Sequence, residues 1–373
     1  MINEQSKKPD LILAAVITMA LVLGILILSS ASATLSQSKF NDSYYLIKHQ
    51  LALGIIPGIF LGFLAYKIPL EFLRKIALLL LLVAIFLLAL VFVPGVGFSS
   101  GGAQRWVHFG FISIQPAEVL KPIFIIYLAS WLASRTGSNR KNTKKEFGNT
   151  LAAFLMVVGL IGSLLLKQPD LSTFCIVAMV AFAMYFLSGT PLKHTIFIIG
   201  LGVLSLLALI YFEPYRFQRV YSWLWPETDP LGKGFQANQA LVITGSGGAF
   251  GHGFGSSSAT YVLLPELIGD SIFASYAQEL GFIGGLLLAG LFVVFAWRGF
   301  SVAAASSDKF KYLVACGITI WITLQAVINI SSTIGLIPLS GIPLPFVSYG
   351  GTAIAMELIA VGLLLNISRQ LRT

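Results

Sequence analysis

Charged residues and reactive side chains are scarce in this chain. Only 10% of its 373 residues are charged, and it has two cysteines and four histidines. Both cysteines, Cys175 and Cys316, lie in apolar stretches, so a disulfide framework is not indicated. No cysteine–histidine set has zinc-ligand spacing, and no Gly-x-Ser-x-Gly motif is present. The sequence therefore argues against a zinc enzyme and against a serine hydrolase.

Apolar residues dominate the composition. They make up 57% of the chain, and its mean hydropathy is +0.87. A bilayer core of about 30 Å requires roughly 20 apolar residues per helix, and ten stretches meet or approach that length. We predict an all-α polytopic membrane protein, one domain over residues 1–373, with about ten transmembrane helices. The predicted spans are 11–32, 49–68, 72–93, 115–133, 150–167, 173–190, 193–212, 272–297, 309–330 and 350–368.

The basic residues predict the orientation of these spans. The formal net charge is +9, but lysines and arginines are scattered between apolar spans, which argues against a nucleic-acid partner. Sixteen of the 24 basic residues fall in alternate connections, counted from the N-terminal segment. Because cytoplasmic loops carry an excess of Lys and Arg, we expect both termini in the cytoplasm. The long connection between spans seven and eight then faces outward.

This connection, residues 213–272, is predicted to form an extracytoplasmic subdomain that carries the chemistry. It is polar, aromatic and rich in glycine, and exposed loops on a rigid scaffold commonly carry function. Arg216 and Arg219 suit forked contacts to phosphate. Asp270, at the rim of span eight, suits a general base if it is partly buried. The alternative for Asp270 is an N-cap of that helix.

The glycine-rich part of the connection spans residues 245–255. Gly247 and Gly248 allow close approach of the backbone and unusual dihedral angles. The pattern is neither a Walker loop nor a dinucleotide fingerprint, so it is a weak signal by itself.

Two more polar clusters lie at predicted helix ends. Arg105 precedes span four, where Glu118 and Lys121 are three residues apart and share a helix face. This pair is interpreted either as an ion pair that locks the helix or as a phosphate-binding group at a cavity. The segment 167–170 carries a Lys and an Asp around a proline, and a helix cap is the favoured interpretation.

An apolar segment between spans nine and ten, residues 340–351, contains two prolines and three glycines. Such a backbone is tolerated at membrane depth only where protein buries it or where it lines a cavity. We predict a re-entrant or cavity-floor segment here, called the cavity floor below, with Pro343, Pro345 and Ser348 as its candidate site residues. Glu279 and Glu357, inside spans eight and ten, are interpreted as hydrogen-bonded packing groups rather than a transporter's proton relay.

Read together, these motifs resemble one family, the SEDS proteins (shape, elongation, division and sporulation). Within it the chain resembles the FtsW type more than the RodA type, on the softer evidence of residues 29–32 and 44–45. The matching segments occur in family order and cover nearly the whole chain: 102–106, 115–121, 168–171, 216–219, 229–236, 246–255, 264–266, 270–274, 279–281 and 341–351.

The resemblance implies a peptidoglycan glycosyltransferase that polymerises lipid II during cell division or wall growth. It places the enzyme in the bacterial cytoplasmic membrane, acting at the outer face with a class B penicillin-binding transpeptidase as partner. It also implies that Asp270 is catalytic and takes the proton from the 4-hydroxyl of the acceptor sugar. No cofactor is required by the sequence, and a divalent cation is left open. The candidate residues for the lipid pyrophosphate and its cavity are Arg105, Glu118, Lys121, Arg216, Arg219 and Lys233.

The chain also departs from the family pattern. The family usually has Thr-Asp-Phe where this chain has Gly269-Asp270-Ser271, a lysine at Thr260 and an acid at Gln278. The missing lysine removes one positive charge from the predicted pyrophosphate site. Two other functions therefore stay open: a transporter that flips the lipid-linked precursor, and a non-catalytic scaffold for the transpeptidase.

Overall fold

A computed structural model describes residues 8–100, 103–110, 112–136, 144–225, 234–257 and 268–371. Within these ranges nine helices are long and apolar enough to cross a membrane, and a tenth apolar helix, α8, has 17 residues. The predicted fold class is confirmed. The spanning elements are α1 (Leu11–Ala31), α3 to α4 (Tyr45–Lys67), α5 (Leu70–Leu90), α6 (Pro116–Arg135), α7 (Lys144–Lys167), α8 (Leu171–Leu187), α9 (Leu192–Tyr211), α12 (Ile272–Ala304), α13 (Lys309–Thr333) and α14 (Gly351–Arg369).

Several helix boundaries differ from the sequence prediction for local reasons. The second span starts earlier, because α3 (Tyr45–Gln50) continues through a π-helical turn (Leu51–Ile55) into α4 (Ile56–Lys67). Span six is shorter than predicted and begins at Leu171, since the Asp170 carboxylate accepts a hydrogen bond from the Thr173 backbone N–H at 3.2 Å. An N-cap of this kind satisfies one of the orphan donors of a helix.

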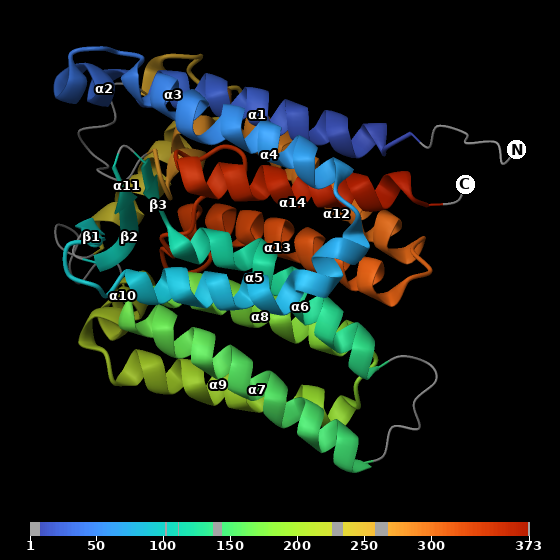
Figure 1. The fold of residues 1–373 in the computed structure, drawn as a ribbon. Helices are drawn as coiled ribbons and strands as arrows, with labels where there is room; N and C mark the ends of the chain where they lie inside the picture. The colour runs from blue at the N-terminus through green and yellow to red at the C-terminus, as the bar shows by residue number, and fades with distance from the viewer. Residues whose placement is uncertain are drawn as a thin grey trace, which may run out of the picture.

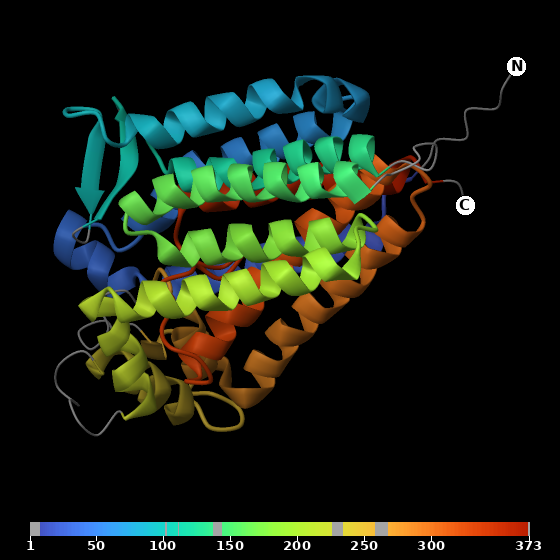
Figure 2. The same ribbon diagram turned by 90° about the horizontal axis from the view of Figure 1, so that it is seen from below.

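The two ends of the helix bundle differ in construction. Both termini lie at one end (Figure 1), as an even number of crossings requires. The opposite end carries the short helices α2 (Ala33–Phe40), α10 (Pro214–Leu224) and α11 (Phe235–Ser246). Figure 2 shows α12 running obliquely to the helices α7, α8 and α9. The large connection therefore lies at the end away from the termini.

A small antiparallel sheet at this same end was not predicted. It comprises β1 (Gly97–Ser100), β2 (Ala103–Phe109) and β3 (Ile112–Ile114), in the order β1-β2-β3. Val107 pairs with Gly97 on one side and with Ile114 on the other. The sheet sets the direction in which the chain enters α6, which carries the buried Glu118 and Lys121.

Helix α14, the last helix of the chain, packs closely against α4. Gly54, in the π-helical turn, and Gly58 and Gly62, in α4, recur every four residues, and side chains at these positions would collide with α14. An added Cβ at Gly62, for example, would lie 2.7 Å from the Leu358 carbonyl oxygen. Small residues at this spacing let two helix backbones approach each other in a membrane, where packing drives association.

Candidate active site

Asp270 lies in the turn that precedes α12 and is partly exposed. The amide of Asn329, on α13, donates one hydrogen bond to the Asp270 carbonyl oxygen and another to the Ile342 carbonyl oxygen, each 2.7 Å long. The Ser271 hydroxyl donates to the Asp270 carboxylate at 3.2 Å. The main chain at Asp270 is therefore held from α13, while its side chain stays partly accessible.

The predicted cavity floor holds the residues just before Asp270. The Ser348 hydroxyl donates to the Gly269 carbonyl oxygen at 2.5 Å and accepts from the Leu344 backbone N–H at 2.7 Å. The Tyr349 backbone N–H donates to the Ile268 carbonyl oxygen at 2.9 Å. Since Ser348 bonds to the main chain of Gly269, the departure from the family at that position leaves the contact intact.

The floor is irregular and largely buried, as the sequence predicted. Pro345 and Ser348 are buried and Pro343 is half-buried. Its polar backbone groups are satisfied from neighbouring helices: the Gln50 amide donates to the Ser348 carbonyl oxygen at 3.2 Å and accepts from the Gly350 N–H at 3.0 Å.

Arg219, on α10, reaches the residue just before the same floor. Its guanidinium donates to the Leu339 carbonyl oxygen at 3.2 Å and lies over the ring of Tyr215, 4.9 Å from the centroid. Two residues further on, a Cβ added at Gly341 would lie 3.7 Å from the Asp270 carboxylate. One three-residue stretch therefore approaches the predicted base at one end and accepts a hydrogen bond from a predicted phosphate ligand at the other.

The other two arginines also donate to carbonyl oxygens rather than to carboxylates. Arg216 donates to the Leu209 carbonyl at 3.2 Å. Arg105, on β2, donates to the Gln168 carbonyl at 3.2 Å and to the Pro169 carbonyl. A carbonyl orients a guanidinium but does not neutralise its charge, and each guanidinium has five N–H donors. The three positive charges at this end are positioned but not compensated by these contacts.

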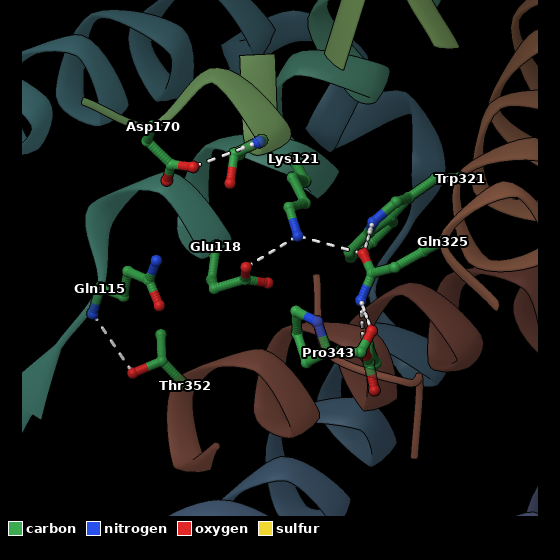
Figure 3. Close-up of polar contacts among 10 residues, drawn as sticks. Gln115, Glu118, Lys121, Asp170, Trp321, Gln325, Pro343 and Thr352 are labelled. Atoms are coloured by element: carbon green, nitrogen blue, oxygen red, sulfur yellow. Dashed lines mark hydrogen bonds and ion pairs between the residues drawn. The ribbon is translucent and has the colours of Figure 1, made fainter. Parts of the chain in front are cut away.

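Lys121 and Glu118 form a buried ion pair, which was one of the two predicted interpretations. The Lys121 ammonium lies 2.7 Å from the Glu118 carboxylate, and both side chains are at most 3% exposed. Figure 3 shows Lys121 pointing between Glu118 and Gln325, whose amide oxygen accepts a hydrogen bond from it at 3.1 Å. In this structure the pair locks α6 to α13, and its predicted contact with pyrophosphate stays a prediction.

The same network reaches the cavity floor. The Gln325 amide nitrogen donates to the Pro343 carbonyl oxygen at 3.1 Å and lies 3.3 Å from the Glu357 carboxylate. Glu357 in turn accepts from the Phe346 backbone N–H at 2.8 Å. Glu357 is thus a hydrogen-bonded packing group, as predicted, and it connects the floor to the buried ion pair.

The glycine-rich run packs against a break in α12. Gly281 interrupts that helix with φ of 68°, and a Cβ at Gly251, where φ is 80°, would lie 2.1 Å from the Glu279 carbonyl oxygen. The Gly253 N–H donates to this same carbonyl at 3.0 Å. At Gly247 an added Cβ would lie 2.0 Å from the Ala277 carbonyl oxygen. Glycine is needed at positions 247 and 251 because the backbone of α12 approaches too closely to leave room for a side chain.

The Glu279 carboxylate completes this packing. It accepts from the Ser257 hydroxyl at 2.5 Å, from the Ser30 hydroxyl of α1, and from the Gly255 N–H at 3.3 Å. The side chain is 1% exposed. Glu279 therefore joins α1, α12 and the glycine-rich run, which agrees with the packing role predicted for it.

Some predicted positions lie outside the described residues, namely Lys233, Thr260 and the segment 264–266.

The carboxamides Gln50, Gln325 and Asn329 organise the site but were not predicted. Their signal was a buried amide inside an apolar span, which costs free energy unless it is hydrogen-bonded. Among the described residues, no group of three or more His, Cys, Asp or Glu side chains could hold a metal ion.

Comparison with known proteins places the whole chain in one family. Residues 10–373 match the family model of FtsW, RodA and SpoVE, described as cell cycle protein. Stage V sporulation protein E of Bacillus subtilis is 39% identical over 367 residues, covering 98% of each chain. A probable peptidoglycan glycosyltransferase FtsW of Coxiella burnetii is 37% identical over 352 residues, covering 93% of each.

Solved structures share the fold. A chain from a peptidoglycan synthase complex, described as coordinating polymerization and crosslinking, superposes with a TM-score of 0.77 at 27% identity, covering 97% of this chain and 98% of that one. The rod shape determining protein RodA of Thermus thermophilus superposes with a TM-score of 0.70 at 26% identity, covering 98% of each chain.

Proposed function

Because this chain belongs to the FtsW/RodA/SpoVE family of cell cycle proteins, we propose that it is a peptidoglycan glycosyltransferase that polymerises lipid II. The observation that carries the proposal is the stretch Leu339–Gly341, which contacts the Arg219 guanidinium at one end and approaches the Asp270 carboxylate at the other. A glycosyl transfer from a lipid pyrophosphate requires a base beside a cationic group. The names of the relatives support the same reaction class.

In this reaction Asp270 acts as the general base. Its carboxylate takes the proton from the acceptor 4-hydroxyl, whose oxygen forms a bond to the anomeric carbon of the donor. The bond from that carbon to the pyrophosphate oxygen breaks, and the lipid pyrophosphate leaves with the electron pair. The hydroxyl of Ser271 stabilises the charged form of Asp270 before proton transfer.

Arg219, Arg216 and Arg105 are proposed to stabilise the leaving pyrophosphate. Preorganised charges aimed at developing negative charge usually supply the largest catalytic term. The carbonyl contacts orient the guanidinium groups in advance, so little reorganisation is needed when substrate arrives. Lys121 acts indirectly in this proposal, through the ion pair and Gln325 that support the floor.

We place this site at the outer face of the bacterial cytoplasmic membrane, with both termini in the cytoplasm. The two-to-one distribution of basic residues supports that orientation, and the termini share one end of the bundle. A class B penicillin-binding transpeptidase is the proposed partner, supported by the similarity to a chain of a synthase complex that couples polymerization to crosslinking.

The test uses purified protein, its cognate transpeptidase with an inactivated crosslinking site, and lipid II. We expect glycan chains from wild type and a rate about 10²- to 10⁴-fold lower for Asp270→Asn, the range for loss of a general base. Asp42→Asn is the matched control, because Asp42 is a carboxylate of the α2–α3 turn that pairs with Lys48. It should retain wild-type activity.

Other outcomes would contradict the assignment. Equal chain synthesis by wild type and Asp270→Asn would remove Asp270 from the role of base. If no chains form and labelled lipid II crosses proteoliposome membranes, the chain is a flippase. If it neither polymerises nor transports while the transpeptidase still requires it for activity, it is a scaffold.

A further inference from the structure

A cavity of about 540 Å³ lies between α5 and α6, close to the end of the bundle that carries the termini. It is formed by the first turns of α5 and the last turns of α6, so it is separate from the Asp270 site. Its size falls in the range of roughly 300–1,000 Å³ that ligand pockets occupy. The residues considered below are Arg74, Lys75, Leu78, Tyr127, Ser130 and Trp131.

The lining presents hydrogen-bond donors that have no acceptor in the described part of the chain. The Arg74 guanidinium makes no hydrogen bond there, and its two carboxylate neighbours, Glu71 and Asp308, are both 3.9 Å away. The Lys75 ammonium, the Tyr127 hydroxyl and the Trp131 indole N–H likewise have no acceptor among the described residues. Four donor-bearing side chains in the lining of one cavity fit a ligand with several acceptor oxygens, such as a phosphate group.

The charge of the lining favours an anion. Two cations, Arg74 and Lys75, face one lining carboxylate, Glu71, which leaves a formal charge of +1. Asp308 lies outside the lining, and its carboxylate is shared: one oxygen accepts from the Lys311 N–H at 3.0 Å and the other lies 3.9 Å from the Arg74 guanidinium. The backbone at Arg74 is held in place by the Ser130 hydroxyl, which donates to the Arg74 carbonyl oxygen at 3.2 Å.

The surroundings indicate a lipid rather than a free anion. From the cavity, Leu78, Leu82 and Phe86 continue along one face of α5 and are each at least 56% exposed. This face provides an apolar path for an acyl chain towards the bilayer centre. Tyr127 and Trp131 lie one helical turn apart on α6, and aromatic residues with a polar edge are typical of the headgroup level of a membrane.

We propose that this cavity binds the headgroup of an anionic phospholipid, with the phosphodiester at Arg74 and Lys75 and an acyl chain along α5. Basic pockets between transmembrane helices are a known means of holding anionic headgroups. The proposal does not depend on the glycosyltransferase assignment, because the site shares no residue with it.

The test is native mass spectrometry of the full chain in detergent, titrated with phosphatidylglycerol, with phosphatidylcholine of the same acyl chains, or with glycerol 3-phosphate. We expect one tightly retained phosphatidylglycerol per chain and at least tenfold weaker binding of the other two. The double variant Arg74→Gln/Lys75→Gln should bind phosphatidylglycerol about 20-fold more weakly, since each basic group near a headgroup contributes severalfold in affinity. The matched control, Lys8→Gln/Lys193→Gln, removes two charges outside the cavity and should bind as wild type does.

The single variant Lys75→Gln separates weaker lipid binding from misfolding, because Lys75 is exposed and its replacement should not disturb the fold. It should weaken binding about fivefold with an unchanged melting temperature. Equal phosphatidylglycerol binding by the double variant and its control would overturn the proposal. Equal binding of phosphatidylcholine would overturn the charge argument, and glycerol 3-phosphate binding as tightly as the lipid would show a site for a free phosphate instead.

Discussion

The cavity floor (residues 340–350) and the glycine-rich run (residues 245–255) are two irregular segments at the same end of the bundle, and they are held in different ways. Side chains from α3, α13 and α14 bond to the floor, through Gln50, Gln325 and Glu357. The glycine-rich run instead fits its own backbone against the break in α12. The floor is therefore held mainly by polar side chains, whereas the run is held mainly by close backbone contacts, with one side-chain bond from the Gly255 N–H to the Glu279 carboxylate.

This difference matters for function because the floor contacts the turn that carries Asp270. Ser348 and Tyr349 bond to the two residues before it, whereas the backbone hydrogen bonds that join the glycine-rich run to α12 reach residues 278–283. A change in the floor should alter catalysis, and a change in the run should alter stability.

Gly251→Ala should destabilise the protein most, by about 4 kcal/mol. The added methyl would lie 2.1 Å from the Glu279 carbonyl oxygen at a residue with φ of 80°, and overpacking and left-handed strain add together. Gly341→Ala has a similar φ of 69° but meets only the Asp270 carboxylate, at 3.7 Å. It should cost about 1–2 kcal/mol and lower glycan synthesis. Thermal melting and the lipid II assay measure both, and equal melting temperatures for the two variants would contradict the comparison.

Asn329→Leu should lower activity about 100-fold, because a small displacement of the Asp270 backbone misplaces the base. It leaves two carbonyl oxygens without their donor, at a cost of about 3 kcal/mol. Asn366→Leu is the matched control, since the Asn366 amide also bridges two carbonyls, those of Ala65 and Ile68. Both variants should lose similar stability in a melting experiment. If Asn366→Leu loses as much activity per folded molecule, Asn329 has only a structural role.

Ser348→Ala should reduce the rate about tenfold and destabilise by about 1–2 kcal/mol, because it removes the bonds to Gly269 and Leu344. Ser257→Ala removes a comparable bond, to Glu279, and should change the melting temperature while sparing the rate. The decisive readout is kcat compared with KM: Ser348→Ala should lower kcat. A rise in KM alone would place Ser348 in substrate binding.

Trp223→Phe should have the smallest effect. The Trp223 indole N–H donates to the Gly335 carbonyl oxygen at 2.8 Å and so anchors α10. Losing this bond should cost about 1 kcal/mol and raise KM less than threefold, because Arg219 lies on the same helix. Steady-state kinetics with lipid II would check it, and a loss of kcat with unchanged KM would show that α10 acts in the chemical step.

Helix positions and the polar outline of the site could be predicted from the sequence, because each depends on local composition. Apolar length located the spans, and prolines with glycines located the floor. The role of the glycine-rich run could not be predicted, since a close approach of the backbone needs a partner, and the partner here is the α12 break around Gly281. The carboxamides were missed for a related reason: a single Asn or Gln in a span shows no spacing pattern.

The hydrogen-bond partners of Arg105 could not be predicted from the sequence for the same reason. Its sequence position beside glycine and tryptophan indicated an anion site, but its two carbonyl acceptors come from the turn after α7, more than sixty residues away. The unpredicted sheet places it there, because Arg105 lies in the central strand β2. Long-range placement of this kind depends on how separate helices pack, which no local pattern of residues records.

The close packing of α4 against α14 has a consequence for biogenesis. The glycine face of the second span is synthesised well before the helix that covers it, because α4 begins at Ile56 and α14 begins only at Gly351. The helices between them are therefore made before Gly54, Gly58 and Gly62 meet their partner. Until then the nascent protein exposes an unfilled groove to lipid or to an insertase, and a chain that stops one helix early has nothing to close it.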